Sequence, residues 1–244
     1  MANTHSTDLQ DASTQFWSIN DGDQTGLQAF DDITLEAWIK IDRLPSTATH
    51  HMTIIGKYYS SNTDREWMMQ LRTDDTIRFY YSSDGQNTTY IASTAAIVDG
   101  DDVGVWVHIA LSCDISAKTG NFYKNATGVN TDAGVGIQTA IKNGASMVVI
   151  GANNNGLTDY MDGKVDEVRV WSDVRTPTEI SDNYDSELVG NEAGLVGYWK
   201  FSNNGLDETA NDNDLTNNNV ATFSSDVPFD ATVATDTGNM LLFF

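Results

Sequence analysis

The chain has one cysteine, Cys113, only three prolines, and no long apolar run. A single cysteine cannot form an intrachain disulfide, which excludes a fold held by a disulfide framework. No stretch approaches the 18 or more consecutive apolar residues of a membrane-spanning helix. The segment 1–14 has neither a basic start nor an apolar centre, so no secretory signal peptide is visible.

Positive charge is also scarce. Lysine and arginine total 13 against 35 aspartates and glutamates, which gives a formal net charge of −22. Nucleic acids and anionic membranes are bound largely by neutralising their phosphates, so we expect neither as a partner. An excess of acidic residues is compatible with three roles: solubility in a salty medium, binding of divalent cations, or docking onto a basic partner.

Short segments of alternating apolar and polar residues are plentiful, and glycine, asparagine, aspartate and serine separate them. In residues 33–41 the apolar side chains occupy every second position, which predicts a strand with one face in a core. A dozen or so such segments, with no repeat or proline-rich linker, indicate one all-β domain. Thr176, Pro177 and Glu179 form the start signal of a helix that we predict over 177–188.

Four segments resemble one family. Residues 160–180 read YMDGKVDEVRVWSDVRTPTEI, residues 30–41 read FDDITLEAWIKI, residues 105–114 read VWVHIALSCD and residues 195–201 read LVGYWKF. Together they are similar to the laminin-G-like, concanavalin A-like jelly rolls. The resemblance implies an all-β fold, a two-sheet antiparallel jelly-roll sandwich with one short helix. It does not select a function, because this sandwich carries lectins, glycan hydrolases and adhesion modules.

The C-terminal end differs from the rest. We expect a jelly-roll domain over 1–223 and a C-terminal extension over 224–244 that ends in five apolar residues, 240–244. Such residues are costly to leave in water. They are expected to pack either on the domain itself or on a neighbouring subunit.

Catalytic residues are not expected. The related glucanases place paired carboxylates in an E-x-D-x-x-E strand, and no segment here matches it. Asp166 and Glu167 are adjacent, and adjacent residues of a regular strand face opposite ways. His108 matches a structural position of the family, and Cys113 alternates with apolar residues, which predicts a buried, inert thiol.

Calcium is the expected cofactor, in a structural role. Ca²⁺ takes six to eight oxygen ligands, often from aspartates and asparagines in tight loops. One candidate loop contains Asp21 and Asp23, and a second, at 207–214, resembles a loop that borders Ca²⁺ in related proteins. The resemblance to glucanases adds an acid on the 164–171 strand. The candidate ligands are Asp21, Asp23, Asp166, Asp207, Asp212 and Asp214.

A sugar-binding surface needs exposed aromatic rings beside amide and carboxylate groups. Tyrosines and a tryptophan are frequent between residues 58 and 90, and asparagines gather at 153–155. Many of these aromatic residues are also expected to pack in the core or across strands. The candidate ligand-binding residues are Tyr59, Trp67, Tyr81, Asn153 and Asn154.

These features favour a non-catalytic binding or adhesion module. We expect it to be a component of a surface or virion assembly, such as a phage decoration or fibre protein, located extracellularly or on the virion. Its partner would be a protein lattice, or neighbouring subunits bound through the C-terminal tail. One alternative is a lectin-like domain that binds a surface glycan. Another is a glycan hydrolase or lyase whose site has no recognisable motif.

Overall fold

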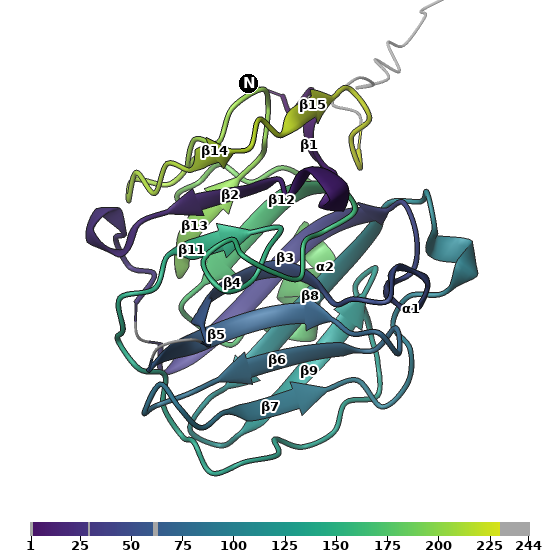
Figure 1. Ribbon diagram of the computed structural model, residues 1–244. Helices are drawn as coiled ribbons and strands as arrows, with labels where there is room; N and C mark the ends of the chain where they lie inside the picture. The colour runs from purple at the N-terminus through teal and green to yellow at the C-terminus, as the bar shows by residue number, and fades with distance from the viewer. Residues whose placement is uncertain (1, 29, 61–62, 230–244) are drawn as a thin grey trace, which may run out of the picture.

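Two antiparallel sheets, packed face to face, make up the computed structural model, which describes residues 2–28, 30–60 and 63–229 (Figure 1). Sheet A has the strand order β10 (Thr127–Gly128), β9 (Thr119–Lys124), β8 (Val107–Asp114), β3 (Asp32–Ile41), β12 (Gly163–Trp171), β1 (Ser6–Leu9) and β15 (Thr222–Ser224), and β13 (Leu195–Trp199) also pairs with β12. Sheet B has the order β14 (Thr216–Asn218), β2 (Phe16–Ile19), β11 (Val148–Ile150), β4 (Met52–Tyr59), β5 (Asp64–Leu71), β6 (Ile77–Tyr81) and β7 (Thr89–Ala92). The jelly-roll sandwich expected from the sequence is confirmed.

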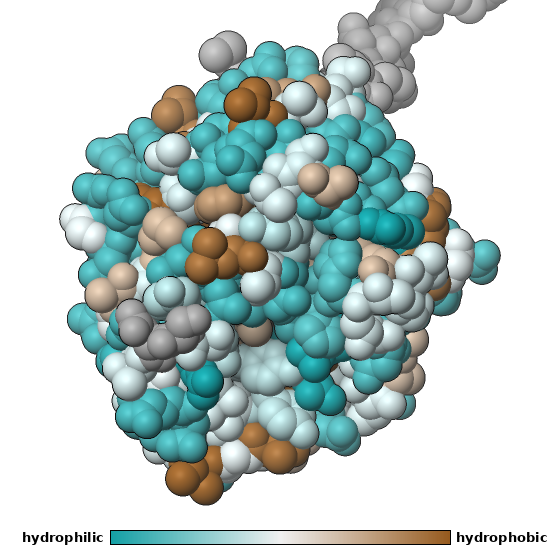
Figure 2. All heavy atoms as spheres, in the orientation of Figure 1, coloured by the Kyte–Doolittle hydropathy of each residue, from teal (hydrophilic) through white to brown (hydrophobic). Residues whose placement is uncertain are grey.

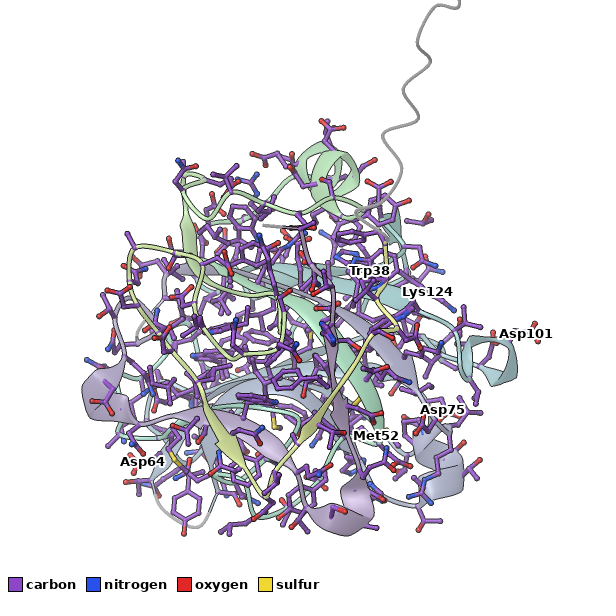
Figure 3. The ribbon with its side chains drawn as sticks, turned by 90° about the horizontal axis from the view of Figure 1, so that it is seen from above. Trp38, Met52, Asp64, Asp75, Asp101 and Lys124 are labelled. Carbon is purple, nitrogen blue, oxygen red and sulfur yellow. The ribbon has the colours of Figure 1, made fainter. Side chains whose placement is uncertain are left out.

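The core lies between the sheets and follows from strand alternation. In β3, Ile33, Leu35, Ala37 and Ile39 are buried between the sheets. The intervening side chains point to the outer side of sheet A. Sheet B contributes the opposing layer from β4, β5, β6 and β11, and Figure 3 shows side chains filling the space between the two sheets.

Strand β12 departs from regular alternation at its centre. Its register with β3 shifts between Asp166 and Arg169, and Glu167 has φ of 49°. Val165 and Val168, three positions apart, both lie in the core, so a β-bulge occupies the two residues between them. The bulge overturns the expectation that Asp166 and Glu167 face opposite ways. Both carboxylates lie on the outer side of sheet A.

Two α-helices are present in the described part of the chain, where one was expected: α1 (Pro45–Ala48) and α2 (Pro177–Asn183). Thr176 and Glu179 form the capping box that the sequence predicts for α2. The helix ends at Asn183 rather than near residue 188. The carbonyl oxygens of Asn183 and Ser186 accept hydrogen bonds from the Arg169 guanidinium, which holds the chain after α2 against sheet A in a non-helical path. Short 3₁₀ turns complete the helical elements: η1 (Asp11–Ser13), η2 (Asp21–Asp23) and η3 (Gly100–Asp102).

The domain continues past the expected boundary at residue 223. Strand β15 spans that position and pairs with β1. Beyond it, Asp226 is bound by Lys40, at 2.8 Å, and by the indole nitrogen of Trp106, at 2.9 Å. Phe229 packs edge-on against Trp38 on the outer side of sheet A. The apolar residues 240–244 lie outside the described residues, so their packing stays a prediction.

Within the described ranges, no helix has the length and apolar character to span a membrane.

Candidate ligand-binding site

The six candidate calcium ligands lie on three segments of the chain, and Asp21 and Asp23 share the first of them, η2. Asp21 forms an ion pair with the buried Lys57 of β4, at 2.5 Å. Asp166 lies under the segment after α2. Asp207, Asp212 and Asp214 belong to the loop after β13. Within the described ranges, no group of three or more histidine, cysteine, aspartate or glutamate side chains is arranged to hold a metal ion. Calcium binding therefore stays a prediction of the sequence.

The two acidic loops do meet, as their positions near the two ends of the sequence suggest, but an amide joins them. The side chain of Asn213 accepts a hydrogen bond from the Thr25 nitrogen, at 2.7 Å, and donates to the Thr25 oxygen, at 3.0 Å. Asp207 organises its own loop: its two carboxylate oxygens accept four hydrogen bonds, from the nitrogens of Tyr198, Thr209 and Asn213 and from the Thr209 hydroxyl. Asp207 thus has the hydrogen-bonding pattern of a structural carboxylate.

Asp166 and Glu167 share one partner. The amide nitrogen of the Asn3 side chain lies 3.0 and 2.9 Å from the oxygens of Asp166 and 3.3 Å from Glu167 Oε1. Burial, and then the charge of Glu167, raise the pKa of Asp166 well above its ordinary value. The exposed fractions of the two side chains are 0% and 1%, so a substrate cannot reach this carboxylate pair.

Next to this pair, Glu36, His108 and Arg169 form a buried charged network on the same side of sheet A. Glu36 lies 3.2 Å from the His108 ring nitrogen and accepts a hydrogen bond of 2.6 Å from the Trp171 indole. Burial lowers the pKa of His108, although Glu36 opposes the shift. The Tyr184 ring, just after α2, covers both His108 and Trp38. The network joins α2 to the sheet, which is the structural role the resemblance implied for His108.

Two of the five candidate ligand-binding residues are wrong. Trp67 and Tyr81 have exposed fractions of 0% and pack in the core between the sheets. They occupy the inward positions of β5 and β6, where a ligand cannot reach them. Their neighbours along the chain, Met68 and Tyr80, occupy the outward positions of the same strands.

The other three candidates lie at one border of the outer face of sheet B. Tyr59 ends β4 and is half-buried. Asn154 accepts hydrogen bonds from the nitrogen and hydroxyl of Ser60, and Asn153 donates to Asp159 at 3.0 Å. These bonds hold the loop between β11 and β12 against β4 (Figure 1). Contact of these three residues with a ligand stays a prediction.

The outer face of sheet B carries a row of residues that runs across the strands. Val149 pairs with Gly56, Gly56 with Met68, Met68 with Tyr80, and Tyr80 with Tyr90. A Cβ atom at Gly56 would lie 3.0 Å from the Met68 side chain, so glycine leaves room for Met68 to lie flat there. Tyr58 and Arg65 form the next cross-strand pair, and Gln70 and Arg78 lie on the opposite side of the row.

Arginines accompany the tyrosines on this face. The Arg78 guanidinium lies 4.7 Å from the centre of the Tyr90 ring, and that of Arg72 lies 5.8 Å from the centre of the Tyr80 ring. Cation–π contacts of this kind fix both partners. We refer to the six residues as the Tyr–Arg face: Tyr58, Tyr80, Tyr90, Arg65, Arg72 and Arg78. Figure 2 views this side of the molecule, whose surface is mainly hydrophilic with isolated apolar residues.

Tyr58, Tyr80 and Tyr90 lie in the aromatic-rich stretch 58–90, but the candidates chosen from it were Tyr59, Tyr81, which is the inward neighbour of Tyr80, and the inward Trp67. The arginines were given no role. The alternation of β5 identifies its outer face from the sequence. Trp67, Met69 and Leu71 form the more hydrophobic of its two alternating series, which assigns the residues between them to the outer face. On this basis Arg72, and Arg78 with Tyr80 on the next strand, could have been grouped together.

A surface hollow of about 530 Å³ lies on another side of the molecule, between residues 2–4 and 200–208. Its cation, Lys200, is 8% exposed on its side chain and lies 3.2 Å from Glu187. Because that charge is already paired within the domain, the hollow has less to offer a ligand than the Tyr–Arg face.

Comparisons with known proteins agree with the architecture. A protein from Bacteroides ovatus, described as a candidate carbohydrate-binding protein, superimposes with a TM-score of 0.67 and 19% identity over 92% of this chain; the chain spans 60% of its length. The heptameric SAP-like pentraxin of Limulus polyphemus superimposes with a TM-score of 0.63 and 17% identity, covering 91% of this chain and 94% of the pentraxin. No curated protein sequence matches the chain significantly.

The family assignment rests on the sequence itself. The model of the concanavalin A-like lectin/glucanases superfamily matches residues 11–181, more than half of the chain. This range includes three of the four resembling segments. The chain belongs to the concanavalin A-like lectin/glucanase superfamily.

Proposed function

We propose that the chain is a non-catalytic, lectin-like glycan-binding module whose binding site is the Tyr–Arg face. The observation that carries the proposal is the gathering of three half-buried tyrosine rings on one outer sheet face, on the strands β4, β6 and β7. A tyrosine ring offers an apolar surface to the C–H groups of a sugar, and its hydroxyl can bond sugar hydroxyls. Similarity to the candidate carbohydrate-binding protein of Bacteroides ovatus supports the proposal.

Neighbouring residues hold the side chains of the site in place. Tyr80 and Tyr90 are cross-strand neighbours with ring centres 5.8 Å apart. Gln70 lies beside them and is fixed by hydrogen bonds to Thr53, at 3.0 Å, and to Asp159, at 3.1 Å. Side chains held by rigid strands and by neighbouring hydrogen bonds lose little conformational entropy on binding. The face is therefore preorganised for a ligand.

A glycan array with the full chain, followed by titration calorimetry on the best glycan, tests this function. Tyr80→Ala and Tyr90→Ala should each weaken binding by about tenfold or more, which is about 1.4 kcal/mol. Tyr80→Phe should lose less, because it keeps the ring. Tyr184→Ala is the matched control, since Tyr184 is a half-buried tyrosine on the sheet A side. An array without any bound glycan, or tyrosine variants with unchanged affinity, would overturn the proposal.

A second candidate function, as a component of a surface or virion assembly, is favoured by the path of residues 224–229. Asp226 binds Lys40, Lys164 and Trp106, which directs the chain along the outer side of sheet A, away from the Tyr–Arg face. A partner bound there would leave the glycan site free. Deletion of residues 230–244 tests the idea: lost association with an unchanged melting temperature supports assembly, and unchanged association contradicts it.

A further inference from the structure

Most cations of this protein are neutralised within the domain. Nine of the 13 lysines and arginines have a carboxylate oxygen within 4.0 Å in the described part of the chain. Of the four that do not, three are the arginines of the Tyr–Arg face, and the fourth is Lys118, between β8 and β9. A chain with 35 acidic residues offers many carboxylates to pair with its arginines. Three arginines without such a partner on one face therefore point to a functional role.

These arginines also have hydrogen-bond donors to spare. A guanidinium has five N–H donors. Within the described residues, Arg65 donates to the carbonyl oxygen of Gln86, Arg72 to Gln70 Oε1 at 2.9 Å, and Arg78 to the Tyr80 hydroxyl at 3.3 Å. The Nε atoms of Arg65 and Arg78 are buried and have no partner among those residues. The guanidinium groups are thus positioned but not saturated.

Two carboxylates close to this face are bonded to other groups. Asp159 accepts hydrogen bonds from Gln70 and Asn153, and Asp74 accepts from the hydroxyl of Thr76 at 2.6 Å. In the part of the chain that the structure describes, neither comes within ion-pair distance of the three arginines. A guanidinium matches carboxylate and sulfate geometry with paired N–H donors, and a charge-assisted bond of this kind is stronger than a neutral one.

We propose that the glycan bound at the Tyr–Arg face is acidic, with its carboxylate or sulfate groups held by Arg65, Arg72 and Arg78 and its sugar rings packed on the tyrosines. The proposal rests on the glycan-binding function proposed above and adds the chemical class of the ligand.

Charge favours a glycan over a nucleic acid as the occupant. The chain as a whole has a net charge of −22, which repels a polyanion with a charge on every phosphate. Screening limits that repulsion to about 8 Å at physiological ionic strength, so three local arginines can still attract a few well-placed anionic groups. An acidic oligosaccharide can carry an anionic group on only some of its sugars and also has apolar ring faces, and therefore matches both components of the site.

Titration calorimetry with the full chain tests the proposal with five probes. Hexagalacturonate supplies carboxylates, a κ-carrageenan hexasaccharide supplies sulfates without carboxylates, and maltohexaose is the neutral sugar. Hexaglutamate carries carboxylates without sugar rings, and a single-stranded DNA hexamer carries phosphates. We expect one of the two acidic sugars to bind at least about tenfold more tightly than the other four probes. The sugar that wins identifies the anionic group.

Variants assign the effect to the face. Arg72→Gln and Arg78→Gln should each weaken binding of the preferred acidic sugar by about tenfold or more. Arg78→Lys keeps the charge but loses the paired donors and should weaken it less. Lys118→Gln is the charge-matched control and should leave affinity unchanged. Melting curves verify that each variant is folded.

Three results would overturn the proposal. Equal binding of neutral and acidic sugars, with tyrosine dependence but no arginine dependence, would reject the acidic ligand and keep the glycan-binding function. Tight, arginine-dependent binding of hexaglutamate or DNA would replace the glycan with a protein or nucleic-acid partner. An acidic sugar whose affinity is lowered equally by Lys118→Gln would show only a general charge effect.

Discussion

The side-chain amide of Asn3 lies 2.9 and 3.0 Å from the two carboxylate oxygens of Asp166. The same nitrogen reaches Glu167 Oε1, so one amide with two hydrogens serves three acceptor oxygens. The main-chain nitrogen of Asn3 also donates to Glu187, at 2.7 Å. The N-terminal segment, β12 and the chain after α2 are therefore joined at one buried point.

Replacing Asn3 by alanine should destabilise the protein, and more so at high pH. Leaving buried acceptors without a donor costs about 1–3 kcal/mol, and more for charged groups. The pKa of Asp166 is already raised by burial, and loss of the amide raises it further. In the folded variant, Asp166 therefore stays protonated to a higher pH than in the wild type. The deficit of the variant in unfolding free energy, relative to the wild type, then grows as pH rises.

Urea unfolding at pH 5 and pH 8 measures this difference. Thr4→Ala is the control, because Thr4 is exposed and bonds to Ser202 at the surface. A deficit for Asn3→Ala of the same size at both pH values would show that the amide contributes by packing alone.

Glu66 should make the stability fall as pH rises. Burial raises the pKa of Glu66 to about 7, although Lys57, 3.5 Å away, opposes the shift. Asp21 already pairs with Lys57 at 2.5 Å, so Glu66 is a second carboxylate beside one ammonium group. Because the folded-state pKa lies above the ordinary 4.5, the native state binds more protons than the unfolded state between these two values, and stability is lost as pH rises through this range.

The matched variant Glu66→Gln isolates that contribution. Its unfolding free energy relative to wild type should improve by roughly 2–3 kcal/mol between pH 5 and pH 8. Unfolding curves at half-unit steps of pH provide the measurement. A constant difference across the range would mean that Glu66 stays ionised in the folded protein.

The sequence predicts the sheets well where alternation is regular. In β3 the apolar positions are those buried between the sheets, and the four resembling segments fall on β3, β8, β12 and β13 as expected. The contact between the loops at Thr25 and Asn213 also follows from the meeting of the two ends of a jelly roll. These features depend on local periodicity and on the fold family, both of which are visible in one sequence.

The site could not be predicted as completely. The bulge in β12 places Asp166 and Glu167 on one side, and no residue in that segment marks it, because the positive φ falls on a glutamate rather than a glycine. β6 alone does not distinguish Tyr80 from Tyr81, because both of its faces carry aromatic residues; the alternation of the neighbouring strand β5 is needed as well. The unpaired state of Arg72 and Arg78 depends on where the carboxylates of distant loops fold.

Trp171→Ala should cost about 3–5 kcal/mol of unfolding free energy, the range for a large buried aromatic side chain. Trp171 is 1% exposed, and its indole donates to Glu36 at 2.6 Å. Trp171→Phe keeps most of the volume and should cost less, about 1–3 kcal/mol, because Glu36 loses one donor. Chemical unfolding of both variants gives the values. An unchanged melting temperature for Trp171→Ala would contradict the burial of this side chain.

Replacing Asp207 tests whether this residue is a structural carboxylate or a calcium ligand. Each of its oxygens accepts two hydrogen bonds, so Asp207→Asn places an N–H group against N–H and O–H donors and should destabilise the protein by about 1–3 kcal/mol. Asp212→Asn is the control, since Asp212 is exposed with φ of 54°, a conformation that asparagine tolerates.

Melting curves of wild type and both variants, with millimolar-range Ca²⁺ and with excess chelator, distinguish the two roles. A cation that binds only the folded state raises the wild-type melting temperature, which would confirm the calcium predicted from the acidic loops. The loss in Asp207→Asn should be the same in both conditions, because its hydrogen bonds need no metal. A loss that appears only with Ca²⁺ would make Asp207 a ligand and refute the structural role assigned to it.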